Sequence, residues 1–269
     1  MSNPNVIVAG IRGRMGRQIA RLVLDSEKLA LSGGTVPASD SLAGDTIAMT
    51  DTRDTAHDIP VTDDLAKFDG VPDVVIDFTA PDHTMSLLET CLREKSALVI
   101  GTTGFSDEQE EKIRQAAEKI AIVKAGNMSL GINLLTLLVE QAAAALGPDY
   151  DIEIHEAHHR HKKDAPSGTA LMLGEAAATG RKVSLKDQAV YAREGQTGVR
   201  PEGAIGFSVT RAGGIIGEHE VLFGAEEEII SLSHKALDRS VFARGAVTAA
   251  GWVAGREPGL YSMRDVLGL

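Results

Sequence analysis

The first half of the chain alternates short, continuous apolar runs with segments of helical periodicity. The apolar runs have the length and β-branched content of strands buried on both faces of a parallel sheet. A capping box of Ser106 and Gln109 begins one of the helical segments. The predicted strands cover residues 5–9, 29–34, 73–78, 97–100 and 120–124, and the predicted helices cover residues 14–24, 82–95 and 107–119. Such alternation predicts an α/β domain with a doubly wound, mostly parallel sheet.

The pattern changes after about residue 127. Residues 130–146 form an Ala- and Leu-rich helical segment that ends before Gly147, and residues 151–158 alternate as a half-exposed strand does. Further helices are predicted at residues 170–178 and 239–254, and further strands at residues 188–192, 204–211, 218–223 and 228–234. Strands in succession predict an antiparallel or mixed sheet. We expect one domain of residues 1–129 and 239–269, and a second, α+β domain of residues 130–238.

The turn after the first predicted strand is rich in glycine and leads directly into a helix. Glycines let the backbone approach a ligand closely, and N–H groups at a helix start favour negative charge. The turn therefore suits a dinucleotide pyrophosphate. Its spacing, G-x-x-G-x-x-G, departs from the usual G-x-G-x-x-G, and a plain turn with glycines for packing is the alternative. The turn reads Gly10-Ile11-Arg12-Gly13-Arg14-Met15-Gly16.

Two other loops follow predicted strands of the same domain. Carboxyl ends of parallel strands are where such sheets bind ligands, so we expect these loops and the glycine turn to line one cofactor site. The loops read Gly101-Thr102-Thr103-Gly104 and Ala125-Gly126-Asn127-Met128.

The residues at the end of the second predicted strand indicate whether the protein prefers NADH or NADPH. NAD-binding folds usually place an acid there to accept a hydrogen bond from the ribose 2′-hydroxyl. Residues 32–37 contain no acid, so a 2′-phosphate would meet no repulsion, and Arg12 and Arg14 are close enough in sequence to reach it. The hypothesis is that the protein accepts NADPH at least as well as NADH.

Charge and composition exclude several classes of protein. The 269 residues carry a formal net charge of −11, which repels nucleic acid phosphates and anionic lipids, so neither is an expected partner. A single cysteine, Cys91, excludes a disulfide framework and a cysteine-rich zinc site. No signal-like segment or bilayer-length apolar stretch stands out, and we expect a soluble, cytoplasmic protein.

Half of the histidines cluster in one short stretch that also carries cations. A metal site, a solvated basic surface and an anion-binding, proton-donating site are the competing interpretations. Strand geometry places His158 and His159 on opposite sides, and neighbouring cations repel a metal, so we expect none. The stretch reads His155-Glu156-Ala157-His158-His159-Arg160-His161-Lys162-Lys163.

The residues that follow favour the anion-binding interpretation. Ser167 is placed to cap a helix, with the N–H groups of Gly168 and Thr169 facing outward. A helix start beside cations would hold a small polycarboxylate, while His158 and Lys162 can donate protons.

Five motifs together resemble the dihydrodipicolinate reductase family of bacterial lysine and diaminopimelate synthesis. The likeness covers essentially the whole chain, and its block of histidines followed by DAPSGTA is highly specific. The motifs are GIRGRMG at residues 10–16, DFT at 77–79, GTTGF at 101–105, AGN at 125–127 and EAHHRHKKDAPSGTA at 156–170.

This resemblance implies a Rossmann-type dinucleotide-binding domain, an α+β domain with a mixed sheet for substrate binding and tetramerisation, and a homotetramer. It implies an oxidoreductase that uses NADPH or NADH to reduce 4-hydroxy-tetrahydrodipicolinate, a cyclic dicarboxylate, to tetrahydrodipicolinate and water. By position, His158 resembles the catalytic proton donor and acceptor and Lys162 the second proton donor. The implied substrate contacts are His159, Gly168, Thr169 and Arg239, and the implied cofactor contacts are Gly10, Ile11, Arg12, Gly13, Arg14, Met15, Gly101, Thr102, Thr103, Ala125, Gly126, Asn127 and Met128.

Two departures from the family pattern concern the coenzyme. Many members have an acid, often followed by Arg, where this chain has Val36-Pro37, which leaves the preference between NADH and NADPH open. The cofactor loop often reads AANF, and here Met128 replaces the aromatic residue; a thioether can still pack against a ring.

Two rival functions are an amino-acid dehydrogenase, such as an aspartate dehydrogenase, and a non-catalytic nucleotide-binding regulator. An amino-acid dehydrogenase explains the SGT motif at residues 167–169 beside the histidines less well. A nucleotide-binding regulator gives no reason for proton donors.

Overall fold

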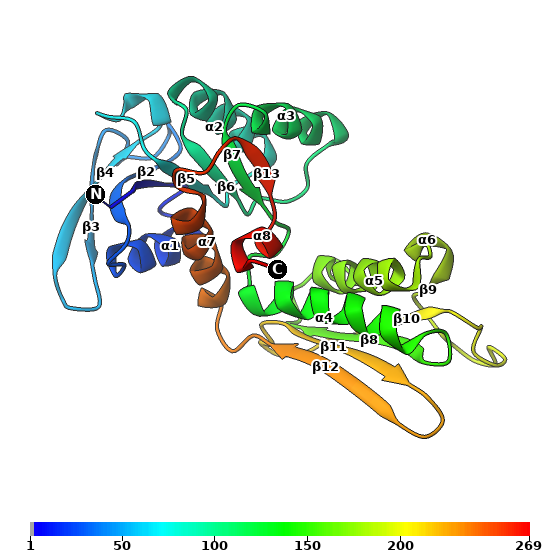
Figure 1. The fold of residues 1–269 in the computed structure, drawn as a ribbon. Helices are drawn as coiled ribbons and strands as arrows, with labels where there is room; N and C mark the ends of the chain where they lie inside the picture. Colours follow the sequence, from blue (N-terminus) through cyan, green and yellow to red (C-terminus); the bar gives the residue numbers. More distant parts are fainter. Residues whose placement is uncertain (1–2) are drawn as a thin grey trace. The chain divides into compact units, whose positions relative to one another are not determined.

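The computed structural model describes residues 3–269, which divide into two compact units (Figure 1). Unit 1 comprises the described part of the first 129 residues together with Ser240–Leu269, and unit 2 comprises Leu130–Arg239. Each unit has its own sheet and its own buried apolar cluster.

Unit 1 is built on an eight-stranded sheet in the order β13-β7-β6-β5-β1-β2-β4-β3. All neighbouring strands are parallel except the β3–β4 pair, as the α/β prediction requires. The chain proceeds from β1 to β2 on one side and later to β5 on the other, which makes the β1/β5 boundary a switch point. The strands are β1 (Asn5–Ala9), β2 (Ala30–Thr35), β3 (Asp45–Thr50), β4 (Ala56–Thr62), β5 (Val74–Asp77), β6 (Ala97–Ile100), β7 (Ala121–Lys124) and β13 (Gly259–Tyr261).

The helices of unit 1 cover both faces of this sheet: α1 and α7 lie together on one face and α2 and α3 on the other (Figure 1). The predicted capping box starts α3, where the Ser106 hydroxyl accepts from the Gln109 N–H and the Gln109 side chain accepts from the Ser106 N–H. The last long helix packs on β5, β6 and β7. The helices are α1 (Arg14–Leu24), the 3₁₀ helix η1 (Leu65–Lys67), α2 (Pro81–Glu94), α3 (Asp107–Ala117), α7 (Ser240–Val253) and α8 (Met263–Leu267).

Three strands of unit 1 are not predicted by the apolar pattern. β3 and β4 form an antiparallel hairpin whose positions are mostly polar or exposed, with Met49, Ile59 and Val61 as buried exceptions. β13 is only three residues long. A continuous apolar run is the signal of a strand buried on both faces, so short or half-exposed strands escape it.

Unit 2 has a five-stranded mixed sheet in the order β12-β11-β8-β10-β9, as predicted for the second domain. The central strand, β8, pairs parallel with β10 and antiparallel with β11. The strands are β8 (Asp151–His158), β9 (Ala189–Val190), β10 (Ile205–Arg211), β11 (Glu218–Gly224) and β12 (Ile229–Lys235).

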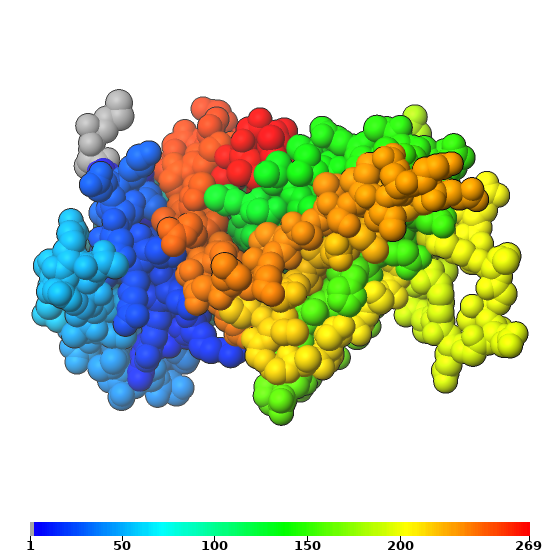
Figure 2. Space-filling model, turned by 90° about the horizontal axis from the view of Figure 1, so that it is seen from below, coloured from blue at the N-terminus to red at the C-terminus, as the bar shows by residue number. Residues whose placement is uncertain are grey.

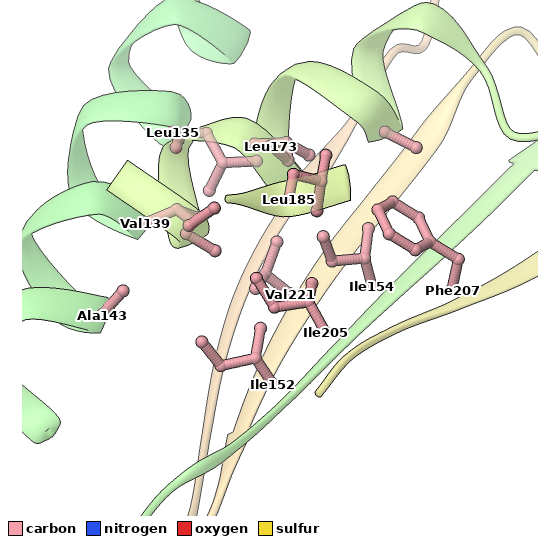
Figure 3. Packing of buried hydrophobic residues seen from close by; sticks show 14 of the residues in the cluster. Leu135, Val139, Ala143, Ile152, Ile154, Leu173, Leu185, Ile205, Phe207 and Val221 are labelled. Carbon is pink, nitrogen blue, oxygen red and sulfur yellow. The ribbon is translucent and has the colours of Figure 1, made fainter. Parts of the chain in front are cut away.

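Two long helices, α4 (Leu130–Leu146) and α5 (Gly168–Arg181), pack against each other and against this sheet. The core between them is apolar, with Leu135 and Leu173 from the helices facing Ile154 and Phe207 from the strands (Figure 3). The alternation along β8 is explained by this core, because every second side chain of its first part is buried.

The strand predicted at residues 188–192 is mostly wrong. A short helix, α6 (Leu185–Gln188), occupies the start of the segment, and β9 pairs over only two residues. Beyond it a loop of residues 191–204 protrudes from unit 2 (Figures 1 and 2). Arg193 and Arg200 tie this loop to the Glu153 carboxylate of β8, at 2.7 and 3.1 Å. Within residues 3–269 no helix combines the length and apolar character that crossing a membrane requires.

Candidate functional site

A cluster of ionisable side chains gathers at the carboxyl end of β8 in unit 2. This strand ends in Glu156 and His158. The sheet register pairs Arg211 of β10 with His158, and His219 of β11 with Glu156. Residues from three neighbouring strands therefore meet at one point.

Glu156 is the hub of the cluster. Its side chain is 1% exposed, and Arg211 binds both of its carboxylate oxygens at 2.8 Å. The Oε1 atom also accepts the Ser167 N–H at 2.9 Å, and Oε2 lies 2.6 Å from Nδ1 of His158. Burial by itself raises the pKa of Glu156, but hydrogen bonds from Arg211, His158 and Ser167 outweigh it and hold the pKa below its ordinary value.

His158 is held between this carboxylate and a second imidazole. Its ring packs edge-on against His219, with centroids 5.1 Å apart and planes at 73°. Burial lowers the pKa of His158 below its ordinary value, and the charges of Lys162 and Arg211 act in the same direction, against the opposing effect of Glu156. The imidazole is therefore mainly neutral at neutral pH.

The start of α5 lies beside the cluster. Ser167 caps the helix by accepting the Ala170 N–H at 3.1 Å, and its hydroxyl lies 3.2 Å from Nε2 of His219. Open space adjoins Gly168, since a Cβ added there would meet no atom of residues 3–269 within 4 Å. A capped helix start with an open first turn can accept a carboxylate.

The side chains of Lys162 and Arg211 and a ring nitrogen of His159 complete this part of the site. Lys162 pairs with Asp164 at 2.9 Å, and Arg211 donates to the Asp164 carbonyl at 2.6 Å, which ties the loop to the sheet. Among the described residues, Nδ1 of His159 is buried without a hydrogen-bond partner. In that same part of the chain no group of three metal-ligating side chains occurs. The arrangement can hold an anion and move a proton.

Arg239, the remaining expected substrate contact, follows the last strand of unit 2. It lies, partly exposed, in the turn between β12 and α7.

Sequence reasoning did not assign roles to Glu156, Arg211 or His219. Glu156 stands inside the histidine motif, two residues before His158. Arg211 and His219 stand at the two ends of the segment RAGGIIGEH, which lies within the part of the chain that the family likeness covers. That segment was the available signal, but only the strand register shows that it reaches the histidines.

The glycine turn of unit 1 is built as expected for close backbone approach. Gly10 has a φ of 64°, and its carbonyl accepts the Gly13 N–H at 2.8 Å. A Cβ at Gly16 would lie 2.2 Å from the Gly10 carbonyl oxygen, so only glycine fits there.

The helix that follows this turn starts without a side-chain cap. Gly13 is the N-cap residue, and the first turn of α1 contains no acid. The helix start therefore offers backbone N–H groups and positive dipole to an anion, and these residues fit a dinucleotide pyrophosphate. Arg14 is exposed, whereas Arg12 pairs with Asp40 at 2.5 Å.

The loops after β5 and β6 are joined by a buried carboxylate. Asp77 accepts hydrogen bonds from the hydroxyls of Thr79, Thr84 and Thr102. The Thr102 hydroxyl is thus engaged inside the protein, although its loop lies at the expected sheet edge. Met128, in the loop after β7, is also buried, at 1% exposure.

Comparison with known proteins identifies the chain as a whole. The family model described as "Dihydrodipicolinate reductase, N-terminus" matches residues 4–128, and the model of its C-terminus matches residues 131–267. The chain belongs to the dihydrodipicolinate reductase family. This assignment confirms the resemblance seen in the sequence and replaces both rival functions.

Individual relatives are similar to this chain over its full length. The 4-hydroxy-tetrahydrodipicolinate reductase of Dinoroseobacter shibae is 51% identical over 99% of this chain and 98% of its own. That of Caulobacter vibrioides is 51% identical over 100% of this chain and 99% of its own. The dipicolinate-bound dihydrodipicolinate reductase of Paenisporosarcina sp. TG-14 superposes with a TM-score of 0.76 at 27% identity, covering 97% of this chain and 98% of that one.

The family membership also establishes the activity. The chain is an NAD(P)-binding oxidoreductase with 4-hydroxy-tetrahydrodipicolinate reductase activity in lysine biosynthesis. Its fold class, a mostly parallel α/β sheet with a second, mixed-sheet unit, matches that of the solved family member.

Proposed function

We propose that unit 2 binds the dicarboxylate substrate and mediates tetramerisation, and that unit 1 binds the nicotinamide dinucleotide. The observation that carries this division is the cluster at the end of β8. It combines an open, capped helix start with Lys162 and with a histidine fixed by hydrogen bonds. A dianionic ring requires these features.

Within unit 2, His159, Gly168 and Thr169 contact the substrate carboxylates, and Arg239 reaches a carboxylate as well. The positive end of α5 and the unpartnered Nδ1 of His159 support the first three. His158 transfers a proton at its ring and Lys162 donates a second proton.

Within unit 1, the turn from Gly10 to Met15 holds the pyrophosphate, and residues 101–103 and 125–128 line the rest of the cofactor site. The bound nicotinamide supplies hydride to the substrate. The uncapped start of α1 neutralises the phosphate charge through backbone N–H groups, at no cost in side-chain ordering.

NADPH and NADH both serve as coenzyme, and NADPH binds at least as well as NADH. Neither Val36 nor Pro37, which follow β2, repels a 2′-phosphate. Asp40 moderates this preference because it already engages the Arg12 guanidinium.

The functional enzyme is a cytoplasmic homotetramer in this proposal. One face of the unit 2 sheet is covered by α4 and α5. The other face presents side chains such as Ile229, which is 69% exposed, and is available to other subunits.

Substitution of the proton-transferring histidine tests this function. We expect His158→Gln to lower kcat by about 10²–10⁴-fold, the usual contribution of a positioned acid or base, while the dinucleotide Kd changes by less than about twofold. Turnover is followed by NAD(P)H absorbance, with aspartate semialdehyde and pyruvate supplied through the preceding synthase.

The matched control is His155→Gln. His155 lies on the same strand and bonds Ser208 at 3.0 Å, outside the cluster. It should leave kcat unchanged. An unchanged kcat in His158→Gln would remove His158 from the mechanism.

A further inference from the structure

The Glu156 carboxylate is placed to act on the reaction without touching the substrate. Its side chain is 1% exposed, and both oxygens are already occupied. Each terminal nitrogen of Arg211 donates to one carboxylate oxygen. The Ser167 N–H donates to Oε1, and Nδ1 of His158 lies against Oε2. A saturated, buried carboxylate has no free lone pair to offer a ligand, so its effect must pass through a neighbour.

The contact with His158 fixes the position of a proton. Glu156 is ionised, because the guanidinium and N–H donors around it stabilise the carboxylate. An ionised carboxylate only accepts hydrogen bonds, so the hydrogen in the 2.6 Å contact belongs to Nδ1 of His158. A neutral imidazole with Nδ1 protonated carries its lone pair on Nε2.

The surroundings of the ring keep it in this orientation. His219 packs edge-on against it, and His219 is itself held by the Ser167 hydroxyl. A Cβ at Gly217 would lie 3.2 Å from Nε2 of His158. Because residue 217, just before β11, is glycine, no side chain at that position covers Nε2.

We propose that Glu156 is a positioning residue of the reductase reaction, which holds His158 as the Nδ1–H tautomer and makes Nε2 the atom that takes up and returns the proton. This rests on the proposed role of His158. In the resting enzyme Nε2 of His158 then carries a lone pair, so it takes up a proton from solvent or from the Lys162 ammonium before it returns one to the substrate. Arg211 acts indirectly, because it holds the Glu156 carboxylate that in turn orients His158.

The first test needs no substitution. Side-chain ¹⁵N NMR at neutral pH distinguishes a protonated ring nitrogen from one with a lone pair. We expect Nδ1 of His158 to be protonated and Nε2 to be unprotonated in the wild-type enzyme. A predominant Nε2–H tautomer, or an imidazolium, would overturn the proposal.

The second test replaces the carboxylate with an amide of the same shape. Glu156→Gln should lower kcat at least ~10-fold and populate the Nε2–H tautomer, while KM and the dinucleotide Kd stay within about twofold. Glu153→Gln is the matched control, since Glu153 lies on the same strand and also binds two arginines, Arg193 and Arg200, away from His158. It should leave kcat and the tautomer unchanged.

A double variant separates the failure of this inference from the failure of the proposed function. If Glu156 acts through His158, adding Glu156→Gln to His158→Gln causes no further fall in kcat. A full kcat in Glu156→Gln beside a low kcat in His158→Gln would overturn only the positioning role. A full kcat in His158→Gln would overturn the proposed function itself.

Discussion

At the scale of single residues, the site depends on partners that are distant in sequence. The sequence points to His158, Lys162 and the helix start because they lie in one contiguous stretch. Arg211 is 55 residues from Glu156, and only the pairing of β8 with β10 brings the two together. Local reasoning finds the groups proposed to react but not those proposed to orient them, because strand register is a long-range property.

The buried imidazole of His219 gives a prediction about pH. Burial lowers the pKa of His219 from 6.5 to about 4. Between these values the unfolded chain binds a proton that the folded chain does not, so the free energy of unfolding falls as the pH falls through this window. From pH 7 to pH 5 we expect this residue to account for a loss of up to about 2 kcal/mol.

Urea unfolding of the wild type and of His219→Gln at the two pH values measures this loss. Only the change with pH is compared, because the substitution also removes the contact with Ser167. An equal pH dependence in the two proteins would contradict the assignment.

The ion pair between Arg12 and Asp40 gives a prediction about the coenzyme. Asp40→Asn frees the guanidinium, so the Kd for NADPH should fall several-fold, with a smaller change for NADH. Isothermal titration of both dinucleotides measures this. Asp63→Asn, which breaks the exposed pair with Lys67, is the control and should change neither Kd. A wild-type preference for NADH of tenfold or more would contradict the coenzyme proposal.

At the scale of elements, the apolar pattern predicts the central strands and long helices well. β1, β6, β8 and α4 have the predicted bounds because their apolar residues form a continuous run or a clear period. The β3–β4 hairpin is missed because its strands are partly exposed, and α6 is missed because four residues are too few for a helical period.

Two glycines of α7 show how tightly that helix packs. A Cβ at Gly245 would lie 1.7 Å from the Met128 carbonyl oxygen, whereas a Cβ at Gly251 would meet no described atom within 4 Å. We expect Gly245→Ala to lower the free energy of unfolding by about 1–3 kcal/mol, or more, through overpacking. Gly251→Ala should raise it by up to about 1 kcal/mol through helix propensity. Urea unfolding compares the two, and a shift of equal sign in both would contradict the packing.

At the scale of the whole molecule, the chain combines two units of different architecture. The switch from alternating strands and helices to successive strands near residue 127 predicts both sheets, one mostly parallel and one mixed. A chain with a net charge of −11 nevertheless carries Arg160, Lys162 and Lys163 in the short histidine stretch that precedes the start of α5. A local concentration of positive groups in an acidic protein is explained by an anionic substrate.

The most direct test of substrate binding in unit 2 is the crystal structure of the protein soaked with pyridine-2,6-dicarboxylate. The ring should sit at the start of α5, with one carboxylate about 3 Å from the N–H groups of Gly168 and Thr169 and the other near His159. Density for the dicarboxylate at any other place, with the end of β8 vacant, would contradict the account.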